Sequence, residues 1–170
     1  KGFDVLLKAF SNMNDDCGLY FVGGEPTKQY LDIVHQNNIQ NVHFIGFTEK
    51  EKLKLYYAAA DVFVLPTRED IWGLVINEAM AAGLPVITTN RCGAGLELIK
   101  NNQNGYLVQV DDVDNLSKKI HVILNDKDLK NKMENNATEV IKNYTVERMA
   151  QWHYEKLSKF KKSYQIYNDK

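Results

Sequence analysis

The sequence predicts an α/β domain with a Rossmann-like, doubly wound parallel sheet and a helical C-terminal tail. Up to Val108, short apolar runs alternate with longer helical patterns, which is typical of a parallel sheet with helices on both faces. The short runs lack strict alternation of apolar and polar residues, which indicates strands covered on both sides. After Val108 only helical patterns follow, without Gly or Pro.

The predicted strands are short runs that are rich in β-branched and aromatic residues and bounded by Gly, Pro, Asn or Asp. In chain order they are Gly18–Val22, Val42–Ile45, Val62–Leu65, Pro85–Thr88 and Tyr106–Val108. The stretch between the last two contains Cys92 and is interpreted as a Gly-rich loop.

The predicted helices follow from apolar periodicity and from end signals. Pro26 is expected in a first turn, Thr48 as an N-cap that forms a capping box with Glu51, and Gly83 as a C-cap. The helices are Phe3–Phe10, Pro26–Asn37, Glu49–Ala59, Gly73–Ala82, Val113–Leu124, Lys127–Ile141 and Val146–Tyr164.

Composition limits the classes of partner. The chain has 170 residues, of which 44% are hydrophobic, and this length suits one domain with its own core. Its 21 basic and 22 acidic residues leave a formal net charge of -1. A nearly neutral domain has no bulk electrostatic reason to bind nucleic acid or anionic lipid, so any anion must be bound by a local site.

The two cysteines, Cys17 and Cys92, match no disulfide framework, which favours a reducing, cytoplasmic compartment. No apolar stretch is long enough to span a membrane, and no signal peptide is visible. Because the first residue is Lys1 rather than Met, we expect the sequence to start inside a larger protein or a processed form.

The most informative segment is PTREDIWGLVINE, residues 66–78. A strand ends in Pro66, a polar acidic loop follows, and a helix starts at Gly73. In open α/β sheets ligands bind beyond the carboxyl ends of strands, and a helix start there offers free N–H groups and a positive dipole to an anion. Gly73 lets a ligand approach the backbone closely. The amides of Trp72–Leu74 are therefore a candidate phosphate site.

Glu78 lies in a helix that is apolar nearly all round, so we expect this helix to be buried. A buried carboxylate needs partners, because an unpaired buried charge is unstable. Ribose hydroxyls are one candidate partner. An arginine of the chain, such as Arg68 or Arg91, is the other, and residue chemistry alone does not favour either.

Signals for other chemistries are weak. Asp112-Val113-Asp114 has the form of an Asp-x-Asp metal motif, but it precedes a helix, where Asp acts as a cap. The four histidines have no ligand spacing, so no metal site is predicted. No Gly-rich dinucleotide motif or P-loop is present, and Cys92 is interpreted as an ordinary thiol.

These motifs resemble the retaining glycosyltransferases of the two-domain GT-B architecture, in the large family (glycosyltransferase family 4, or group 1) of sucrose synthases, mannosyltransferases and capsule-sugar transferases. The family's signature is Glu, seven residues, Glu, with Phe/Trp-Gly after the first Glu and EAMA-x-G-x-P-V from the second. Asp70, Trp72-Gly73 and EAMAAGLPV, which starts at Glu78, have this spacing. Further matches are Lys1-Gly2, FVGG (21–24), VHFIGF (42–47), YYAAADVFVLPT (56–67), Glu97-Leu98-Ile99 and Asn104-Gly105.

The resemblance implies the roles of the acidic pair, Asp70 and Glu78, as the catalytic residues. Glu78 corresponds to the Glu that binds the ribose of the nucleotide. Asp70 occupies the position of the first Glu, whose carboxylate contacts hydroxyls of the donor sugar. An Asp is one methylene shorter, so its reach differs from that of the family's Glu.

The remaining donor-binding residues are also implied by the resemblance. Trp72, Gly73 and Leu74 match the segment that faces the sugar and the diphosphate, and Lys1 matches the Lys that offsets charge on the leaving group. The loop Gly46–Thr48, with Phe47 at its centre, matches the loop beside the base. The pair Gly23 and Gly24 fits a close-approach turn. The donor is expected to be a UDP- or GDP-linked sugar, transferred without a metal or another cofactor.

Residues 1–170 are thus expected to form a single nucleotide-sugar-binding domain that lacks the family's first strand, its Gly-Arg pair and the N-terminal acceptor domain. The absent strand normally lies in the middle of the sheet. The domain alone is expected to be inactive. The whole enzyme would transfer a hexose, with retention, to a glycan or lipid-linked acceptor in polysaccharide biosynthesis. A non-catalytic nucleotide-binding module and a nucleotide-sugar epimerase are the alternatives.

The C-terminal stretch mixes basic and aromatic residues. It packs against the acceptor domain in one hypothesis and lies on the inner face of a membrane as a peripheral contact in the other. The residues concerned are Trp152, Tyr154, Lys156, Lys159, Phe160, Lys161, Lys162, Tyr164 and Tyr167.

Overall fold

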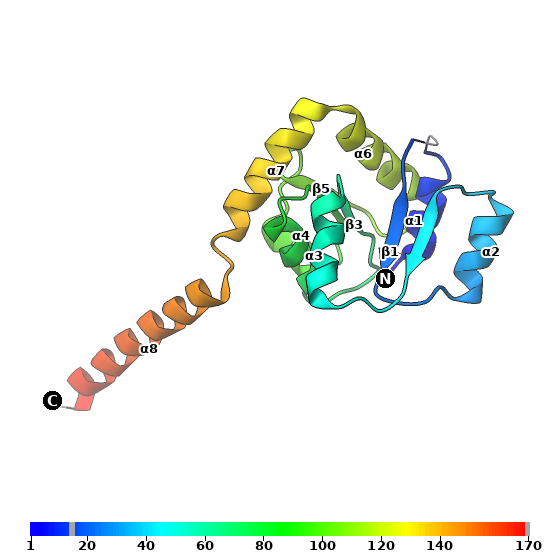
Figure 1. The fold of residues 1–170 in the computed structure, drawn as a ribbon. Coiled ribbons are helices and arrows are strands. Elements are labelled where there is room, and N and C mark those ends of the chain that lie inside the picture. Colours follow the sequence, from blue (N-terminus) through cyan, green and yellow to red (C-terminus); the bar gives the residue numbers. More distant parts are fainter. Residues whose placement is uncertain (14–15, 169–170) are drawn as a thin grey trace.

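Five short parallel strands form the centre of the computed structural model, which describes residues 1–13 and 16–168, with side chains as far as residue 160 (Figure 1). The predicted α/β class with parallel strands is confirmed. The strands divide between two sheets, and within the described residues no ladder joins one sheet to the other. One sheet pairs β1 (Leu19–Val22) with β2 (Val42–Ile45), and the other has the order β3 (Phe63–Leu65), β4 (Val86–Thr89), β5 (Gly105–Val108).

The strands share a direction, so their carboxyl ends meet at one edge of the fold, the lower edge in Figure 1, where the N-terminus also lies. Each predicted strand is present, β2 with the expected bounds and the others with ends that differ by at most one residue. All four residues of β4 are buried, which agrees with its central position between β3 and β5 and with its lack of apolar alternation.

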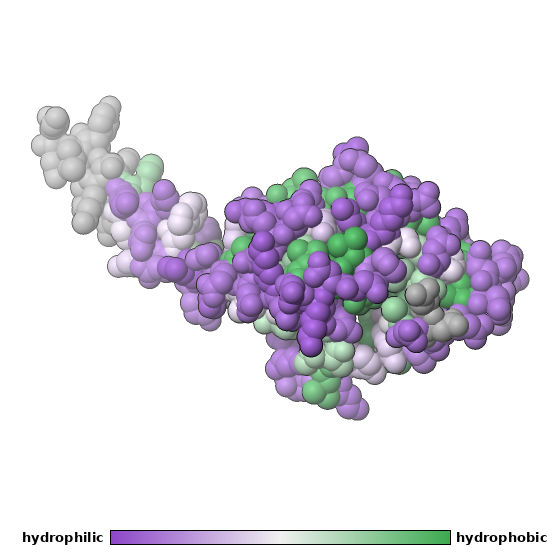
Figure 2. Space-filling view, turned by 90° about the horizontal axis from the view of Figure 1, so that it is seen from above, coloured by the Kyte–Doolittle hydropathy of each residue, from purple (hydrophilic) through white to green (hydrophobic). Residues whose placement is uncertain are grey.

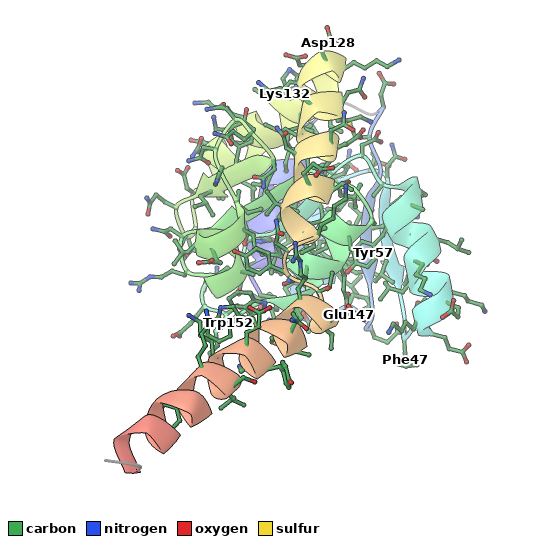
Figure 3. All side chains as sticks on the ribbon, turned by 90° about the vertical axis from the view of Figure 1, so that its left-hand side faces the viewer. Phe47, Tyr57, Asp128, Lys132, Glu147 and Trp152 are labelled. Atoms are coloured by element: carbon green, nitrogen blue, oxygen red, sulfur yellow. The ribbon has the colours of Figure 1, made fainter. Side chains whose placement is uncertain are left out.

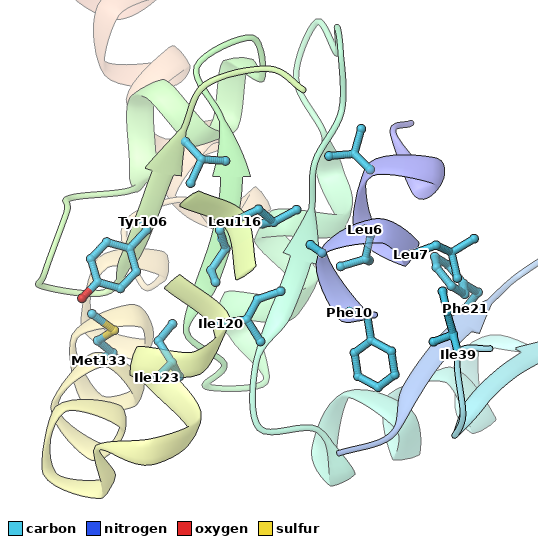
Figure 4. Close-up of a cluster of buried hydrophobic side chains, with 14 residues drawn as sticks. Leu6, Leu7, Phe10, Phe21, Ile39, Tyr106, Leu116, Ile120, Ile123 and Met133 are labelled. Carbon is cyan, nitrogen blue, oxygen red and sulfur yellow. The ribbon is translucent and has the colours of Figure 1, made fainter. Parts of the chain in front are cut away.

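A first core cluster fills the space between the strands and the helices α1 (Phe3–Phe10) and α6 (Val113–Asn125) (Figure 4). Helix α1 packs on both α6 and α2 (Lys28–Gln36) and is buried on most sides, with only Lys8 exposed. Of the predicted apolar face, Leu6, Leu7 and Phe10 are buried, and Phe3 is partly buried against the same cluster. The cluster includes Leu6, Leu7, Phe10, Phe21, Tyr106, Leu116, Ile120 and Ile123.

A second cluster lies around α4 (Leu74–Ala81), which packs against α7 (Lys127–Ile141) and the strands β3 and β4. Helix α4 buries Ile76, Ala79 and Met80. Its other face is open, because Leu74 is 68% exposed and Glu78 is also exposed. The expectation of a helix buried on all sides is wrong, since an apolar composition does not show which face another element covers.

Three helix starts differ from the predictions, and α4 begins at Leu74 rather than Gly73. Pro26 precedes α2, whose N-cap is Thr27, because the Thr27 hydroxyl accepts a hydrogen bond from the backbone N–H of Tyr30. Helix α3 (Lys50–Ala59) has Glu49 at its N-cap, and the Thr48 hydroxyl instead donates to the Gly46 carbonyl at 3.0 Å. The C-cap of α4 is Ala82 rather than the predicted Gly83, which follows it with a left-handed φ of 85° and donates its N–H to the Met80 carbonyl.

Helix α5 (Gly93–Leu98) occupies the stretch that was interpreted as a Gly-rich loop. Asp112 caps α6 by accepting a hydrogen bond from the N–H of Asn115, which confirms its interpretation as a helix cap. Helix α7 begins and ends as predicted.

The last helix, α8 (Val146–Asn168), extends away from the rest of the fold (Figure 1). Its described side chains include a set of exposed apolar ones, whereas the face of the molecule seen from above in Figure 2 is mostly hydrophilic. The side chains of Lys161, Lys162, Tyr164 and Tyr167 lie outside the described ones. No helix in the described part of the chain is long and apolar enough to cross a membrane. The exposed apolar residues of α8 are Val146, Met149, Trp152, Tyr154, Leu157 and Phe160.

Candidate functional site

The loop between β3 and α4 starts at the carboxyl edge, where buried threonine hydroxyls hold it to the neighbouring strand. Thr88 donates to the carbonyl of Leu65 at 2.8 Å, and Thr89 donates to the carbonyl of Thr67 at 2.6 Å. Thr67 in turn donates to the carbonyl of Glu69 at 2.9 Å. Because these three hydroxyls are buried, each bond satisfies a polar group that has no access to water. The first half of the loop is therefore tied to the end of β4.

The second half of the loop is bonded to the start of α5. The N–H of Asp70 donates to the carbonyl of Arg91 at 3.0 Å, and the N–H of Gly93 donates to the carbonyl of Asp70 at 3.1 Å. The carbonyl of Trp72 accepts from the N–H of Ala94 at 2.7 Å and from the Cys92 thiol at 3.1 Å. The free, buried Cys92 thus acts as a structural contact.

Gly73 ends the loop and is the N-cap of α4. Its φ of 88° lies in the left-handed region, and a Cβ there would lie 2.7 Å from the Cys92 sulfur and 3.7 Å from the Asp70 carboxyl carbon. Leu74, the next residue, starts the helix on its exposed side. The first N–H groups of a helix have no intrahelical partner, so the start of α4 presents donors beside Asp70.

Trp72 precedes this helix start and is partly buried. Its indole N–H donates to the side-chain oxygen of Asn77 at 3.0 Å. This bond ties the loop to the second turn of α4, so the ring is held against the helix that it precedes.

Lys1 lies beside Asp70 although the two residues are far apart in the sequence. Gly2, the N-cap of α1, has a φ of 74°, and a Cβ on it would lie 1.9 Å from the Pro66 carbonyl oxygen. This close approach brings the start of α1 against the loop after β3. The Lys1 ammonium then forms an ion pair with the Asp70 carboxylate, whose side chain is only 15% exposed.

Glu78 lies on the open face of α4 and forms no ion pair within the described residues. The hydroxyl of Tyr57, from α3, donates to its Oε2 at 3.0 Å. The alternative partners Arg68 and Arg91 do not contact it. Glu78 is therefore available to a ligand, although it is not buried as the sequence predicted.

The pair of glycines, Gly23 and Gly24, follows β1, and Phe47 follows the adjacent strand β2. The N–H of Gly23 donates to the carbonyl of Ile45 at 3.0 Å, and a Cβ on either glycine would meet nothing within 4 Å. Phe47 is 90% exposed and lies at the edge of the molecule, near the start of α3 (Figure 3). Within the described residues, no hydrogen bond or ion pair connects the two glycines or Phe47 to Lys1, Asp70 or Glu78.

Arg68 connects three segments of the carboxyl edge. Its guanidinium bonds both oxygens of Asp4 on α1, at 3.0 and 2.7 Å, and lies 2.8 Å from an oxygen of Asp111, before α6. The hydrogen bond from Arg68 holds the pKa of the Asp4 carboxyl below its ordinary value of 3.8. The network braces the start of α1, and hence Lys1, against the loop after β3.

Arg68→Met is expected to lower the free energy of unfolding at pH 7 by about 1 kcal/mol, because the bonds are bidentate but the guanidinium is half exposed. Since the pKa of Asp4 is depressed in the folded protein, its stabilisation is present above its ordinary pKa and is lost as the pH falls through the lower, folded value. Urea unfolding at pH 7 and at about pH 3 measures this difference.

The difference in the free energy of unfolding between wild type and Arg68→Met should therefore be smaller at the acidic pH than at pH 7. Lys54→Met, which removes an exposed pair with Glu51 within one helix, is the control and should change stability little. An equal effect of Arg68→Met at both pH values would contradict the role of Asp4.

Two hollows of the described surface are not lined by Lys1, Asp70 or Glu78, although Asp4 lines the second of them. One of about 60 Å³ is lined by residues that include Phe10, Cys17 and Ile39, and one of about 600 Å³ lies between α1 and α2. The candidate site is an open edge. No group of three or more His, Cys, Asp or Glu side chains in the described part could hold a metal ion.

Sequence reasoning missed three contributors to this site, namely Tyr57, Thr89 and Gly93. Tyr57 lies in the segment YYAAADV, but nothing in the sequence pairs it with Glu78. Gly93 could have been found from the sequence, because a glycine in this position indicates that another backbone segment approaches closely.

The family model described as Glycosyl transferases group 1 matches residues 1–140. An uncharacterized glycosyltransferase of Methanocaldococcus jannaschii is 31% identical over 155 residues, which is 88% of this chain and 40% of the relative. The GDP-mannose-dependent alpha-(1-6)-phosphatidylinositol monomannoside mannosyltransferase of Mycobacterium tuberculosis is 34% identical over 140 residues, 75% of this chain and 36% of the relative.

Among solved structures, Anabaena HepE in complex with UDP has a TM-score of 0.86 at 24% identity, over 94% of this chain and 45% of that one. This likeness shows the fold. The chain spans less than half the length of each of these proteins.

Proposed function

Since the chain belongs to the group 1 glycosyl transferases, we propose that it is the donor-binding domain of a two-domain retaining glycosyltransferase. The donor is a UDP- or GDP-linked hexose, and the acceptor is a glycan or a lipid-linked sugar. The observation that carries this proposal is the meeting of Lys1, Asp70 and the start of α4 at the carboxyl edge of the strands.

The diphosphate of the donor would bind at the start of α4. There it meets the free N–H groups of the first turn, the positive end of the helix dipole and the Lys1 ammonium. These positive groups stabilise the charge that develops on the leaving diphosphate, which is where electrostatic catalysis has its largest effect. The same groups take the electrostatic part that a metal ion takes in other glycosyltransferases, and no cofactor is proposed.

The two carboxylates would bind the sugars on either side of the diphosphate. Glu78 accepts hydrogen bonds from the ribose hydroxyls, and Asp70 from hydroxyls of the donor hexose. Lys1 is already paired with Asp70, so its charge also holds that carboxylate close to the diphosphate position. The acceptor attacks on the face that the leaving group vacates, which preserves the anomeric configuration.

Gly23, Gly24 and Phe47 would contact the base end of the nucleotide. Both glycines are exposed with free space above them, and the Phe47 ring offers an apolar surface on which a base can stack. A diphosphate at α4 can connect this group to Asp70 and Glu78, which share no direct contact with it.

The names of the compared proteins support the donor class. One relative is named as GDP-mannose-dependent, and HepE was solved with UDP. The name of this relative also includes phosphatidylinositol monomannoside, which supports a lipid-linked acceptor.

The partner of the domain is proposed to be an N-terminal acceptor domain of the same protein. The exposed apolar side chains of α8, among them Met149, Trp152 and Phe160, suit a covered surface better than a solvated one. A further strand that pairs with β1 and β3 would unite the two sheets, because both edges lack a partner strand in the described residues.

The proposal is tested by titrating UDP and GDP into the chain and following backbone amide shifts by NMR. One of the two is expected to bind weakly, with the largest shifts at Leu74 and Glu78. Binding of neither nucleotide would reject the donor site. Nucleotide binding without sugar transfer or donor hydrolysis by the full-length protein would favour the non-catalytic module.

A further inference from the structure

The open face of α4 carries a single charged residue, Glu78, and this residue is held by one hydrogen bond. Its neighbours on the face, Leu74 and Val75, are apolar and exposed. An exposed glutamate normally samples many side-chain rotamers, because its three torsions are free. The bond from Tyr57 to Oε2 restricts this freedom.

Tyr57 is a rigid donor. Its ring is partly buried and packs against Phe63 of β3, with ring centroids 5.8 Å apart, and against the second core cluster. Figure 3 shows Tyr57 close to the body of the molecule, whereas Phe47 stands at the periphery. With the ring packed and the hydroxyl at the surface, the position of the donor oxygen is set by the core.

The direction of the hydrogen bond is set by the chemistry of the pair. A carboxylate only accepts, so the Tyr57 hydroxyl donates. Burial, and next the bond to Glu78, raise the pKa of Tyr57 above its ordinary value of 10.0, so the hydroxyl keeps its proton at neutral pH. Oε2 is therefore engaged, while Oε1 has no partner among the described residues and can accept from a ligand.

We propose that Tyr57 is a positioning residue that orients the Glu78 carboxylate for the ribose hydroxyls of the nucleotide, and so sets the preference for ribose over 2′-deoxyribose. This inference rests on the proposed function. A carboxylate held in one orientation loses less entropy when it binds two neighbouring hydroxyls than a free one. A site built to bond a hydroxyl rejects the analogue that lacks it.

The chain contains a matched control pair. Tyr144 donates to an oxygen of Glu97 at 2.8 Å, between the end of α7 and α5. Neither residue of this pair is assigned to the donor site. Tyr144→Phe removes the same kind of bond as Tyr57→Phe, and any general effect on stability appears in both variants.

The test measures NMR-derived Kd values of wild type, Tyr57→Phe and Tyr144→Phe for UDP and GDP and for their 2′-deoxy forms. Tyr57→Phe is expected to weaken the preferred ribonucleotide about fivefold to tenfold and its 2′-deoxy form less than about twofold. Tyr144→Phe should leave all of these values unchanged. Spectra of the free variants show whether each remains folded.

Three outcomes overturn the inference and are distinguishable. If Tyr57→Phe weakens binding of the ribonucleotide and of its 2′-deoxy form equally, the bond from Tyr57 to Glu78 only holds α3 to α4 and does not select ribose. Unchanged affinity in Tyr57→Phe shows that Glu78 needs no positioning. Failure of wild type to bind either ribonucleotide removes the proposed function itself, whereas the first two outcomes leave it intact.

Discussion

Glu78→Ala is expected to abolish nucleotide binding by this chain. The substitution removes the only charged group from the open face of α4, and with it the proposed acceptor for two ribose hydroxyls. Loss of two hydrogen bonds to a charged acceptor corresponds to about a hundredfold in affinity, which places weak binding beyond detection. Calorimetry with UDP and GDP measures the change.

Stability is a separate readout for this variant. Glu78 is exposed and forms no ion pair within the described residues, so we expect thermal unfolding to shift little. Glu97→Ala is the matched control, since it removes another exposed glutamate that accepts from a tyrosine. Unchanged binding in Glu78→Ala would reject the role of this residue in the donor site.

Gly93→Ala is expected to have the largest effect on stability, a loss of about 2–4 kcal/mol. A Cβ at Gly93 would lie 2.1 Å from the carbonyl oxygen of Ile71 and 3.3 Å from the Cα of Trp72. Both are backbone atoms, so no side chain can move aside. The loop would separate from α5 and take Asp70 with it, because the N–H of Gly93 bonds the Asp70 carbonyl.

Urea unfolding compares this variant with Gly24→Ala. Gly24 is exposed, its φ is not positive, and a Cβ there would meet nothing within 4 Å, so the control should be nearly neutral. We also expect Gly93→Ala to lose nucleotide affinity, since Gly73 and the start of α4 follow the displaced loop. Equal unfolding midpoints for the two variants would show that the loop and α5 are not held together as described.

Most helices and all five strands could be predicted because their signals are local. Apolar periodicity marks α1, and the Asp at the start of α6 bonds an N–H three residues later. Helix α5 was missed because GAGLEL is short and rich in glycine. Its first turn is supported from outside, by the bonds of Gly93 and Ala94 to the loop after β3, and such support has no local signal.

The exposure of Glu78 was predicted wrongly for a related reason. Helix α4 is apolar apart from Asn77 and Glu78, so its composition is equally compatible with full burial and with one open face. Only the position of α7 and of the strands decides which side is covered. The open side gives the Glu78 side chain access to water, so it lies in an apolar helix without a cationic partner.

The sequence by itself determined the succession of strands and helices, the family and the identity of the acidic pair, because these depend on residue types at fixed short spacings. The tertiary structure decided which side chains of the site contact each other. Lys1 and Asp70 are 69 residues apart in the chain, and Tyr57 and Glu78 are 21 apart. Such contacts depend on how the helices and loops are packed in space, here on the approach of Gly2 to Pro66 and of Tyr57 to Phe63, and no short-range pattern encodes that packing.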